Sequence, residues 1–293
     1  MSTWDGIDEF IAVAEASSFS KAARAIGMSP THVSRSVSQL EVRLQALLFN
    51  RTTRFVELTD DGQVFFDQCR RIAQDRDEAV AMITDRGEPT GELRVTCSTA
   101  IGERFVVPVI RRLAVEHSNL RVSIELTNRI VDLIGEGIDL AVRTGEITDN
   151  RLLGSLVAQR RLYTCASPEY LARRGEPRSV DDLANHDRLI GTSSVWHYQV
   201  AGERVHHRPS SRFRCNSGNA VMDACLSGMG ICQLPEIYVL PYITSGGARL
   251  ILEEFRPEDE PIWAVYPRRR HLHPKIRVAV EVLKRDLRST MGH

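Results

Sequence analysis

The hydrophobic periodicity of the chain changes at one short segment, Gly87-Glu88-Pro89-Thr90-Gly91. Before this segment, apolar residues recur at spacings of three and four, which is the pattern of one-sided helices. After it, short apolar runs alternate with helical segments, which is typical of an α/β domain. Glycine and proline this close together interrupt a helix and favour a hinge. We therefore predict two parts of different fold class, with residues 88–92 as the hinge.

Composition excludes several classes of protein. The 293 residues balance 38 Lys and Arg against 38 Asp and Glu, and this length suits about two domains that bury their cores without disulfides. The apolar stretch at 105–110 is far shorter than the ~20 residues of a bilayer span. Asp5, Asp8 and Glu9 stand where a signal peptide would be basic and then apolar. We expect a soluble, cytoplasmic protein that contacts no membrane.

The N-terminal segment predicts three helices. Helical spacing covers residues 7–17, Ser20 can cap a short second helix, and Gly27 supplies the left-handed residue that ends it. Ser29-Pro30 then begins a third helix that runs to about Leu44. A helix, a turn that contains glycine and a second helix form the helix-turn-helix pattern.

The third helix has two chemically different faces. Its apolar face holds Val33, Val37, Leu40 and Leu44, and its opposite face holds Thr31, Ser34, Arg35 and Ser38. Hydroxyls and one Arg suit a helix inserted into a major groove, where Arg can donate two hydrogen bonds to guanine. A plain three-helix bundle whose polar face meets water is the alternative interpretation. Residues 49–58 then alternate like a two-stranded wing, with Arg51 and Arg54 at its tip, where both can contact DNA phosphate or an adjacent minor groove.

Four spaced motifs carry a family resemblance, at residues 17–23, 33–37 with 40–41, 48–51 and 58–62. They resemble the winged helix-turn-helix of the LysR-type transcriptional regulators, which implies such a domain over residues 1–58. One departure is Gln45, where the family usually has Gly after the preceding Leu. The DNA-binding residues that we expect are Ser20, Lys21, Ser29, Thr31, His32, Ser34, Arg35, Ser38, Arg51 and Arg54.

Residues 59–87 predict one long linker helix. Thr59 fits an N-cap, and two Asp residues follow it in the first turn, where they complement the helix dipole. A seam with coiled-coil spacing follows at Phe65, Cys69, Ile72, Ala79 and Ile83, with Arg76 as a polar interruption. The seam favours pairing of two copies, whereas a helix packed on its own domain is the alternative. In the resembling family this helix pairs protomers, so we expect a homodimer and, by that resemblance, a homotetramer.

Strands alternate with helices in the rest of the chain. The expected strands are 93–97, 122–126 and 138–142, with a helix over 102–116. This order favours a largely parallel sheet, in which ligands bind at the carboxyl ends of strands and helix N-termini direct amides at an anion. Ser98, Thr99 and Ala100 have that position, which suits a carboxylate or a similar small anion. Ordinary helix capping is the alternative.

Five further motifs extend the resemblance, at 128–133, 137–145, 166–171, 228–231 and 265–269. They are similar to the effector-binding domain of the same family, which implies two α/β subdomains like those of periplasmic binding proteins within residues 93–293. By this resemblance, the first subdomain takes 93–161 and 266–293, the second takes 162–265, and a small-molecule effector lies between them. The matching cleft positions are Ser98, Thr99, Ala100, Arg143, Thr144, Asn216, Ser217 and Gly230.

Two features of this region each have two interpretations. Arg143 can clamp an acidic effector or pair with a carboxylate such as Asp139 or Glu146, and we favour the ion pair. The run Trp196-His197-Tyr198 can form a wall of the cleft or pack in a core, and we favour packing.

Catalysis and metal binding have no specific motif to support them. The sequence has no Gly-x-Ser-x-Gly elbow, no Gly-rich phosphate loop and no convincing trio of Ser, His and acid. The six cysteines are scattered without Cys-x-x-Cys, and His206 and His207 would point to opposite faces of a strand. A redox pair of Cys215 with Cys225 or Cys232 is a rival hypothesis, but we favour buried, inert thiols. We expect no enzymatic activity, no cofactor and no metal.

These patterns together predict an α+β multidomain protein with a winged helix-turn-helix, a long linker helix and a two-subdomain α/β effector domain. We expect a sequence-specific DNA-binding transcriptional regulator whose C-terminal domain binds a small, anionic metabolite as co-inducer. The expected partners are double-stranded promoter or operator DNA, the effector and further copies of the chain, with RNA polymerase as a candidate.

Overall fold

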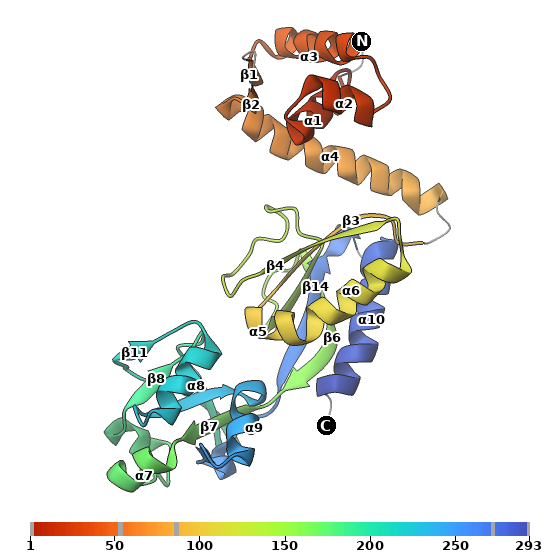
Figure 1. Cartoon of the computed structure of the whole chain (residues 1–293). Helices are drawn as coiled ribbons and strands as arrows, with labels where there is room; N and C mark the ends of the chain where they lie inside the picture. Colours follow the sequence, from red (N-terminus) through yellow and green to blue (C-terminus); the bar gives the residue numbers. More distant parts are fainter. Residues whose placement is uncertain (1–2, 52–54, 85–87, 271–272, 292–293) are drawn as a thin grey trace. The chain divides into compact units, whose positions relative to one another are not determined.

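The computed structural model describes residues 3–51, 55–84, 88–270 and 273–291 (Figure 1). Contacts divide the chain into two units, Met1–Gly87 and Glu88–His293. The first unit is helical with one hairpin, and the second contains two five-stranded sheets with the helices that pack on them. Within the described ranges, no helix is long and apolar enough to span a membrane.

The first unit contains the predicted helices and hairpin. Its elements are α1 (Ile7–Ala16), α2 (Phe19–Ala25), α3 (Pro30–Leu44), β1 (Phe49–Arg51) and β2 (Val56–Leu58). β1 and β2 pair antiparallel, with Phe49 opposite Leu58. The fully buried ring of Phe10 lies 5.3 Å from the ring of Phe49 and 5.4 Å from that of Phe65, between ring centroids. One side chain therefore joins α1 to the hairpin and to the helix that follows it.

The start of α2 differs from the prediction by one capping residue. Ser18, and not Ser20, caps this helix, because the Ser18 hydroxyl accepts a hydrogen bond from the amide of Lys21 at 3.4 Å. The helix begins early because Phe19 packs edge-on against Phe49, with ring centroids 5.8 Å apart. Ser20 therefore lies inside α2 with its side chain exposed.

Both ends of α3 lie where they were predicted. The Ser29 hydroxyl accepts a hydrogen bond from the amide of His32 at 3.2 Å, and the helix ends at Leu44. Gln45 then adopts a left-handed conformation, with φ 55°, and donates its amide hydrogen to the carbonyl oxygen of Glu41. This conformation usually selects glycine, so the departure from the family motif leaves the turn left-handed.

The long helix α4 (Asp60–Thr84) begins with the predicted cap. The Thr59 hydroxyl accepts a hydrogen bond from the amide of Gly62 at 2.9 Å and donates one to the carbonyl oxygen of Leu47 at 2.6 Å. A Cβ atom at Gly62 would lie 2.1 Å from the carbonyl oxygen of Leu48. Glycine is therefore required for α4 to approach the segment before the wing this closely.

The predicted seam of α4 lies in two environments. Phe65 and Cys69 pack into the core of the first unit, as in the alternative interpretation of the pattern. Arg76, expected as a polar interruption, pairs with Asp8 of α1 at 2.9 Å. The Ile72 side chain, by contrast, is 52% exposed. The helix thus packs on its own unit through part of the seam and presents another part to solvent.

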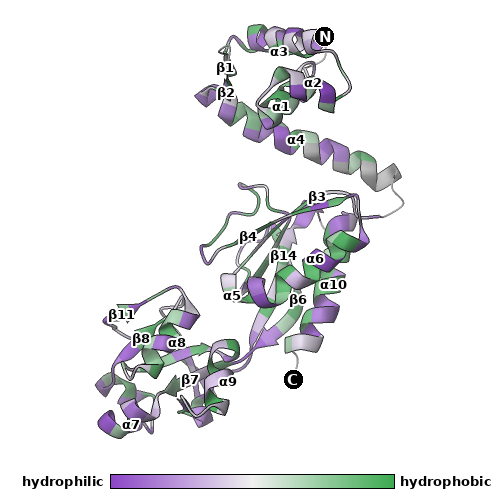
Figure 2. Cartoon of the chain, in the orientation of Figure 1, coloured by the Kyte–Doolittle hydropathy of each residue, from purple (hydrophilic) through white to green (hydrophobic). Residues whose placement is uncertain are grey.

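The first sheet of the second unit is mixed. Its strands in spatial order are β4 (Leu120–Leu126), β3 (Gly91–Cys97), β5 (Leu140–Thr144), β14 (Glu260–Pro267) and β6 (Leu152–Arg160). β3 is parallel to β4 and β5, and β14 is antiparallel to β5 and β6. The helices of this part are α5 (Thr99–Ile101), the π-helical turn η1 (Gly102–Val106), α6 (Val107–Glu116) and α10 (Pro274–Met291). Apolar residues of α6 and α10 pack on the sheet, while their other residues are largely charged (Figure 2).

The chain returns to this first sheet earlier than expected. β14 starts at Glu260, whereas the sequence analysis placed the return at residue 266. The physical reason is that β14 fills the position between β5 and β6, where Ile262 and Ala264 are fully buried.

The second sheet contains strands from the middle of the chain. In spatial order these are β11 (Phe213–Arg214), β8 (Arg188–Ile190), β12 (Ile231–Pro235), β7 (Leu162–Ala166) and β13 (Arg249–Leu250). β12 is parallel to β8 and antiparallel to β7. The accompanying elements are α7 (Pro168–Arg174), α8 (Gly218–Leu226), α9 (Glu236–Thr244), the hairpin β9 (Trp196–Val200) with β10 (Glu203–His207), and the 3-10 turns η2 (Asp181–Asn185) and η3 (Glu253–Phe255). A further 3-10 turn, η4 (Arg268–Arg270), directly follows β14 of the first sheet.

A buried charge network joins the start of β5 to the start of α10. The fully buried carboxylate of Asp139 accepts hydrogen bonds from the guanidinium of Arg270, from the ammonium of Lys275 at 3.1 Å and from the amide of Arg94 at 2.9 Å. This network fixes the C-terminal helix on the first sheet.

Candidate functional site

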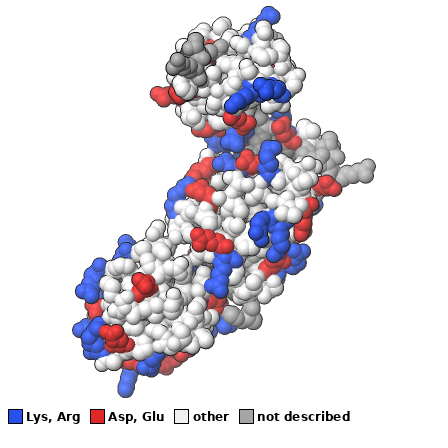
Figure 3. Space-filling model, in the orientation of Figure 1, with Lys and Arg blue, Asp and Glu red and all other residues white. Residues whose placement is uncertain are grey.

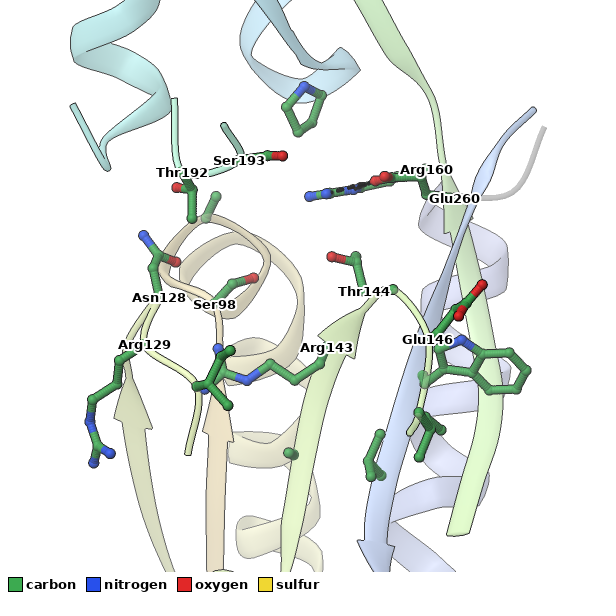
Figure 4. Close-up of a pocket in the computed structure, with 18 of the residues that line it drawn as sticks. Ser98, Asn128, Arg129, Arg143, Thr144, Glu146, Arg160, Thr192, Ser193 and Glu260 are labelled. Atoms are coloured by element: carbon green, nitrogen blue, oxygen red, sulfur yellow. Dashed lines mark hydrogen bonds and ion pairs between the residues drawn. The ribbon is translucent and has the colours of Figure 1, made fainter. Parts of the chain in front are cut away.

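A pocket of about 820 Å³ lies between the two sheets of the second unit. β5, β6 and β14 line one side of it, and β7, β12 and the start of α8 line the other. Pockets that hold small molecules typically measure about 300–1,000 Å³. Polar side chains from both sides extend towards this space (Figure 4).

Arg143 is the most distinctive residue of the pocket. It extends from the end of β5 towards the strand that leads to Ser98, and away from Glu146 (Figure 4). Its guanidinium donates hydrogen bonds to the carbonyl oxygen of Thr127 and, at 2.8 Å, to the hydroxyl of Thr96. Both of these partners are uncharged.

The ion pair that we favoured for Arg143 is wrong. Asp139 is instead enclosed by Arg270 and Lys275, and among the described residues no carboxylate lies within ion-pair distance of Arg143. Burial lowers the pKa of Arg143, because a half-buried guanidinium loses hydration. The pocket therefore contains a partly desolvated positive charge that neutral groups alone hold in place.

The other arginines that line the pocket are each paired with a carboxylate. Arg129 lies 2.6 Å from Glu136, Arg151 lies 2.7 Å from Asp149, and Arg160 lies 2.7 Å from Glu260, measured between nitrogen and oxygen. On the face that Figure 3 shows, Lys and Arg are interspersed with Asp and Glu over the second unit. Arg143 is therefore the one lining arginine without a carboxylate partner among the described residues.

Asn128 connects the two sides of the pocket. Its amide nitrogen donates to the carbonyl oxygen of Asn216 at 3.0 Å, and its side-chain oxygen accepts from the amide of Thr99 at 3.2 Å. The carbonyl oxygen of Asn216 also accepts from the hydroxyl of Thr192 at 3.1 Å. These bonds cross the pocket from the end of β3 to the segment before α8.

The structure brings half of the predicted cleft residues to the pocket surface. Ser98, Ala100, Arg143 and Thr144 line it. Thr99 and Asn216 take part through backbone groups bonded to Asn128. The Ser217 hydroxyl accepts from the amide of Ala220 and so caps α8. Gly230 lies elsewhere, and a Cβ atom there would be 2.5 Å from the carbonyl oxygen of Asp187, so this glycine serves close packing.

The run at 196–198 is divided between wall and core. Trp196 and Tyr198 are both fully buried in one core cluster, and the Tyr198 hydroxyl lies 3.1 Å from that of Thr164. Trp196 and His197 also line the pocket. Packing, the interpretation that we favoured, is therefore confirmed for Trp196 and Tyr198, whereas the half-buried His197 is a wall residue. Burial lowers the pKa of His197, and its Nδ1 lies 3.0 Å from Nδ1 of His206 on the neighbouring strand. At neutral pH we therefore expect His197 to be uncharged.

Several pocket residues escaped the sequence analysis. Asn128 follows β4 at the same carboxyl edge as Ser98, so the rule about strand ends could have found it. Arg160 and Glu260 meet across two strands a hundred residues apart, and Gln233 hydrogen-bonds to the backbone of His197 from the other sheet. Local sequence carries no signal for such long-range pairs.

The first unit presents the predicted recognition face of α3. Thr31 and Arg35 are exposed, and Ser34 and Ser38 are half-buried. In the described part of the chain, no carboxylate lies within ion-pair distance of Arg35. His32 differs from its four neighbours, because its Nε2 lies 3.2 Å from a carboxylate oxygen of Glu9 and therefore links α3 to α1.

The remaining predicted DNA contacts lie around α3. The Ser29 hydroxyl caps α3, Lys21 is exposed on α2, and Arg51 ends β1 opposite Val56. Arg54 lies outside the described residues.

The first unit is a winged helix-turn-helix, and the second unit has two sheets with a pocket between them. This combination defines the class of ligand-binding transcriptional regulators. The family model described as "Bacterial regulatory helix-turn-helix protein, lysR family" matches residues 4–63. The model described as "LysR substrate binding domain" matches residues 86–288. The chain therefore belongs to the LysR family of transcriptional regulators. The members of this family are regulators and not enzymes.

Relatives and solved structures agree with this family. The chain is 31% identical to the transcriptional activator TtdR of Escherichia coli K12 over 96% of this chain and 93% of that protein. It is 31% identical to CrgA of Neisseria meningitidis, a LysR-type regulator, with a TM-score of 0.56 over 95% of this chain and 98% of that one. AphB of Vibrio cholerae shares the fold at 22% identity, with a TM-score of 0.59 over 96% and 98% of the two chains.

Proposed function

We propose that the second unit binds a small carboxylate effector at Arg143, and that this binding changes how the first unit engages promoter DNA. The single observation that carries the proposal is a partly buried guanidinium without a described carboxylate partner. Removing a charge from water costs free energy unless an opposite charge or strong hydrogen bonds replace the hydration. A carboxylate ligand would supply both.

The groups around Arg143 suit such a ligand. The hydroxyls of Ser98 and Thr144 line the same pocket and can donate to carboxylate oxygens. The short helix α5 begins at Thr99, directly after Ser98, and the amide of Thr99 already donates to the side-chain oxygen of Asn128, so the anion contacts that we propose come from Arg143 and the two hydroxyls. Apolar side chains such as Ile130 and Trp263 line other parts of the pocket and can contact the carbon skeleton of an effector.

The test is a thermal-shift titration of the full chain with small mono- and dicarboxylates and, for each acid, its neutral amide. We expect a carboxylate class to raise the melting temperature while its amides do not. Arg143→Gln should weaken this binding at least tenfold, because a hydrogen bond to a charged group contributes about 1.5–3 kcal/mol.

Arg151→Gln is the matched control, because Arg151 lines the same pocket but is paired with Asp149. In this variant, the carboxylate should still raise the melting temperature. Equal shifts with acids and amides, or full binding by a correctly folded Arg143→Gln variant, would exclude Arg143 as the anion site.

For DNA we propose that Thr31, Ser34 and Arg35 of α3 face bases or phosphates, while Lys21 and the wing hold the DNA backbone. Exposure of Arg35 and the absence of a described carboxylate beside it support this role. The proposal includes a cytoplasmic location and a dimer that pairs through the exposed part of α4 around Ile72, with assembly to a tetramer as its extension. Light scattering of the purified chain distinguishes one, two and four copies.

A further inference from the structure

Three cysteines that are far apart in the sequence meet in the second unit. Cys165 lies on β7, Cys232 lies directly opposite it on β12, and Cys225 lies in the last turn of α8. All three are fully buried, and their sulfur atoms lie within 4.8 Å of one another. The Sγ atoms of Cys165 and Cys232 are 3.5 Å apart. These cysteines are scattered along the sequence, whereas the fold collects them into one cluster.

The surroundings of the cluster limit what it can bind. It lies in an apolar core that includes Val221, Met222 and Leu234. Among the described residues, the metal-ligating group at this position contains three sulfurs and no His, Asp or Glu. A ligand of this site must therefore prefer sulfur and accept three donors.

Zn²⁺ fits this donor set poorly, because structural zinc sites are almost always tetrahedral with four protein ligands. Thiolates also select monovalent copper, a soft ion. We propose that Cys165, Cys225 and Cys232 form a trigonal thiolate site for one Cu(I) ion.

The spacing of the sulfurs suits a trigonal site. Three sulfurs held about 2.3 Å from one ion, the length of a metal–thiolate bond, lie roughly 4 Å apart. The observed separations, from 3.5 Å up to at most 4.8 Å, bracket this value, so small side-chain rotations complete the coordination.

Copper binding at the cluster displaces thiol protons. Each Cu–S bond replaces an S–H bond, and the proton leaves to the solvent, so coordination by three thiols releases up to three protons. Loss of all three protons leaves one Cu(I) ion and three thiolates, a site with a net charge of −2.

The site lies behind the effector pocket. α8, which carries Cys225, begins at Gly218, and β12, which carries Cys232, continues into Gln233. Gly218 and Gln233 both line the pocket. Copper at the cluster would therefore fix the two elements that form one wall of the pocket, which makes it a second input to the regulator. This inference concerns a different site and does not depend on the proposed carboxylate.

The test is an anaerobic titration of the reduced, full-length protein with Cu(I), followed by competition with a coloured Cu(I) chelator. We expect one Cu(I) per chain to resist the chelator. Cys165→Ser, Cys225→Ser and Cys232→Ser should each weaken this binding at least tenfold. Cys97→Ser is the matched control, because Cys97 is equally buried but lies in the other sheet of the same unit.

A second measurement uses the wild-type protein and so does not require any variant to fold. In the wild-type protein, Cu(I) should slow alkylation of Cys165, Cys225 and Cys232 during partial unfolding and leave the rate at Cys215 unchanged. The proposal is overturned if no copper survives the competition, if the Cys97→Ser variant loses copper as the cluster variants do, or if Cu(I) protects none of the three thiols.

Discussion

Gln45 carries a backbone conformation that its side chain disfavours. Its φ of 55° lies in the left-handed region. For an L-residue other than glycine, this conformation costs about 1–2 kcal/mol relative to the right-handed one. The amide of Gln45 nevertheless closes α3 by donating to the carbonyl oxygen of Glu41. Local strain is therefore accepted at the turn that leads from α3 to the β1–β2 hairpin.

We predict that Gln45→Gly stabilises the first unit. Relief of the left-handed strain exceeds the loss of chain entropy, so the free energy of unfolding should rise by about 0.5–1 kcal/mol. Urea denaturation followed by circular dichroism measures the change. Gly27→Ala is the control, because Gly27 has φ 68° and the substitution should destabilise the protein. A lower stability of Gln45→Gly would show that the Gln side chain contributes more than its backbone costs.

Arg143 shows which properties of a single residue can be predicted from the sequence. Its place at the end of a strand was predictable from the alternation of elements. Its partners were not, because the competition for Asp139 was decided by Arg270 and Lys275, more than a hundred residues away. The same long-range assembly produced the cysteine cluster from positions that have no local motif.

At the scale of elements, buried charge holds α10 to the first sheet. Asp139→Asn would leave the cations of Arg270 and Lys275 buried without this carboxylate. Removing one partner of a buried ion pair typically costs about 3–5 kcal/mol. We therefore predict a loss of this size for the second unit, measured by urea denaturation.

The control for this prediction is an exposed ion pair. Glu258→Gln removes the partner of Arg204, and both side chains are more than half exposed. Such pairs contribute at most about 1 kcal/mol, so the stability should hardly change. Similar losses for the two variants would contradict the structural role of the Asp139 network.

Elements differed in how well sequence predicted them. Helices with local caps were predicted closely, as α3 shows, because Ser29-Pro30 acts within one turn. The start of β14 was missed, since its place between β5 and β6 depends on strands distant in sequence. The seam of α4 was ambiguous, because helical periodicity does not distinguish packing on the same unit from packing on a second copy.

At the scale of the whole molecule, we predict that three histidines make the folding stability depend on pH. Burial lowers the pKa of His186, His197 and His207, all in the second unit. The unfolded chain then binds more protons than the folded chain once the pH falls below about 6.5, the ordinary pKa of histidine. Folding stability should therefore fall as the pH drops from 7 towards 5.

Calorimetric melting across this range measures the effect. His207→Gln should reduce the slope, because one of the three uncharged imidazoles is removed. The carboxyl groups with lowered pKa, such as that of Asp182, titrate below pH 5. They therefore do not contribute to the change in stability between pH 7 and 5. A melting temperature that is constant or rises as the pH falls would contradict the prediction.

We propose that α3 of this LysR-family chain recognises specific DNA. The most direct measurement is selection from a random double-stranded library by the full-length protein and by Arg35→Ala. We expect the wild type to enrich paired half-sites about one helical turn or a multiple apart. Arg35→Ala should lose about 1–3 kcal/mol at the enriched site and little on random DNA. Equal losses on both kinds of DNA, or no enriched sequence for the wild type, would contradict the account.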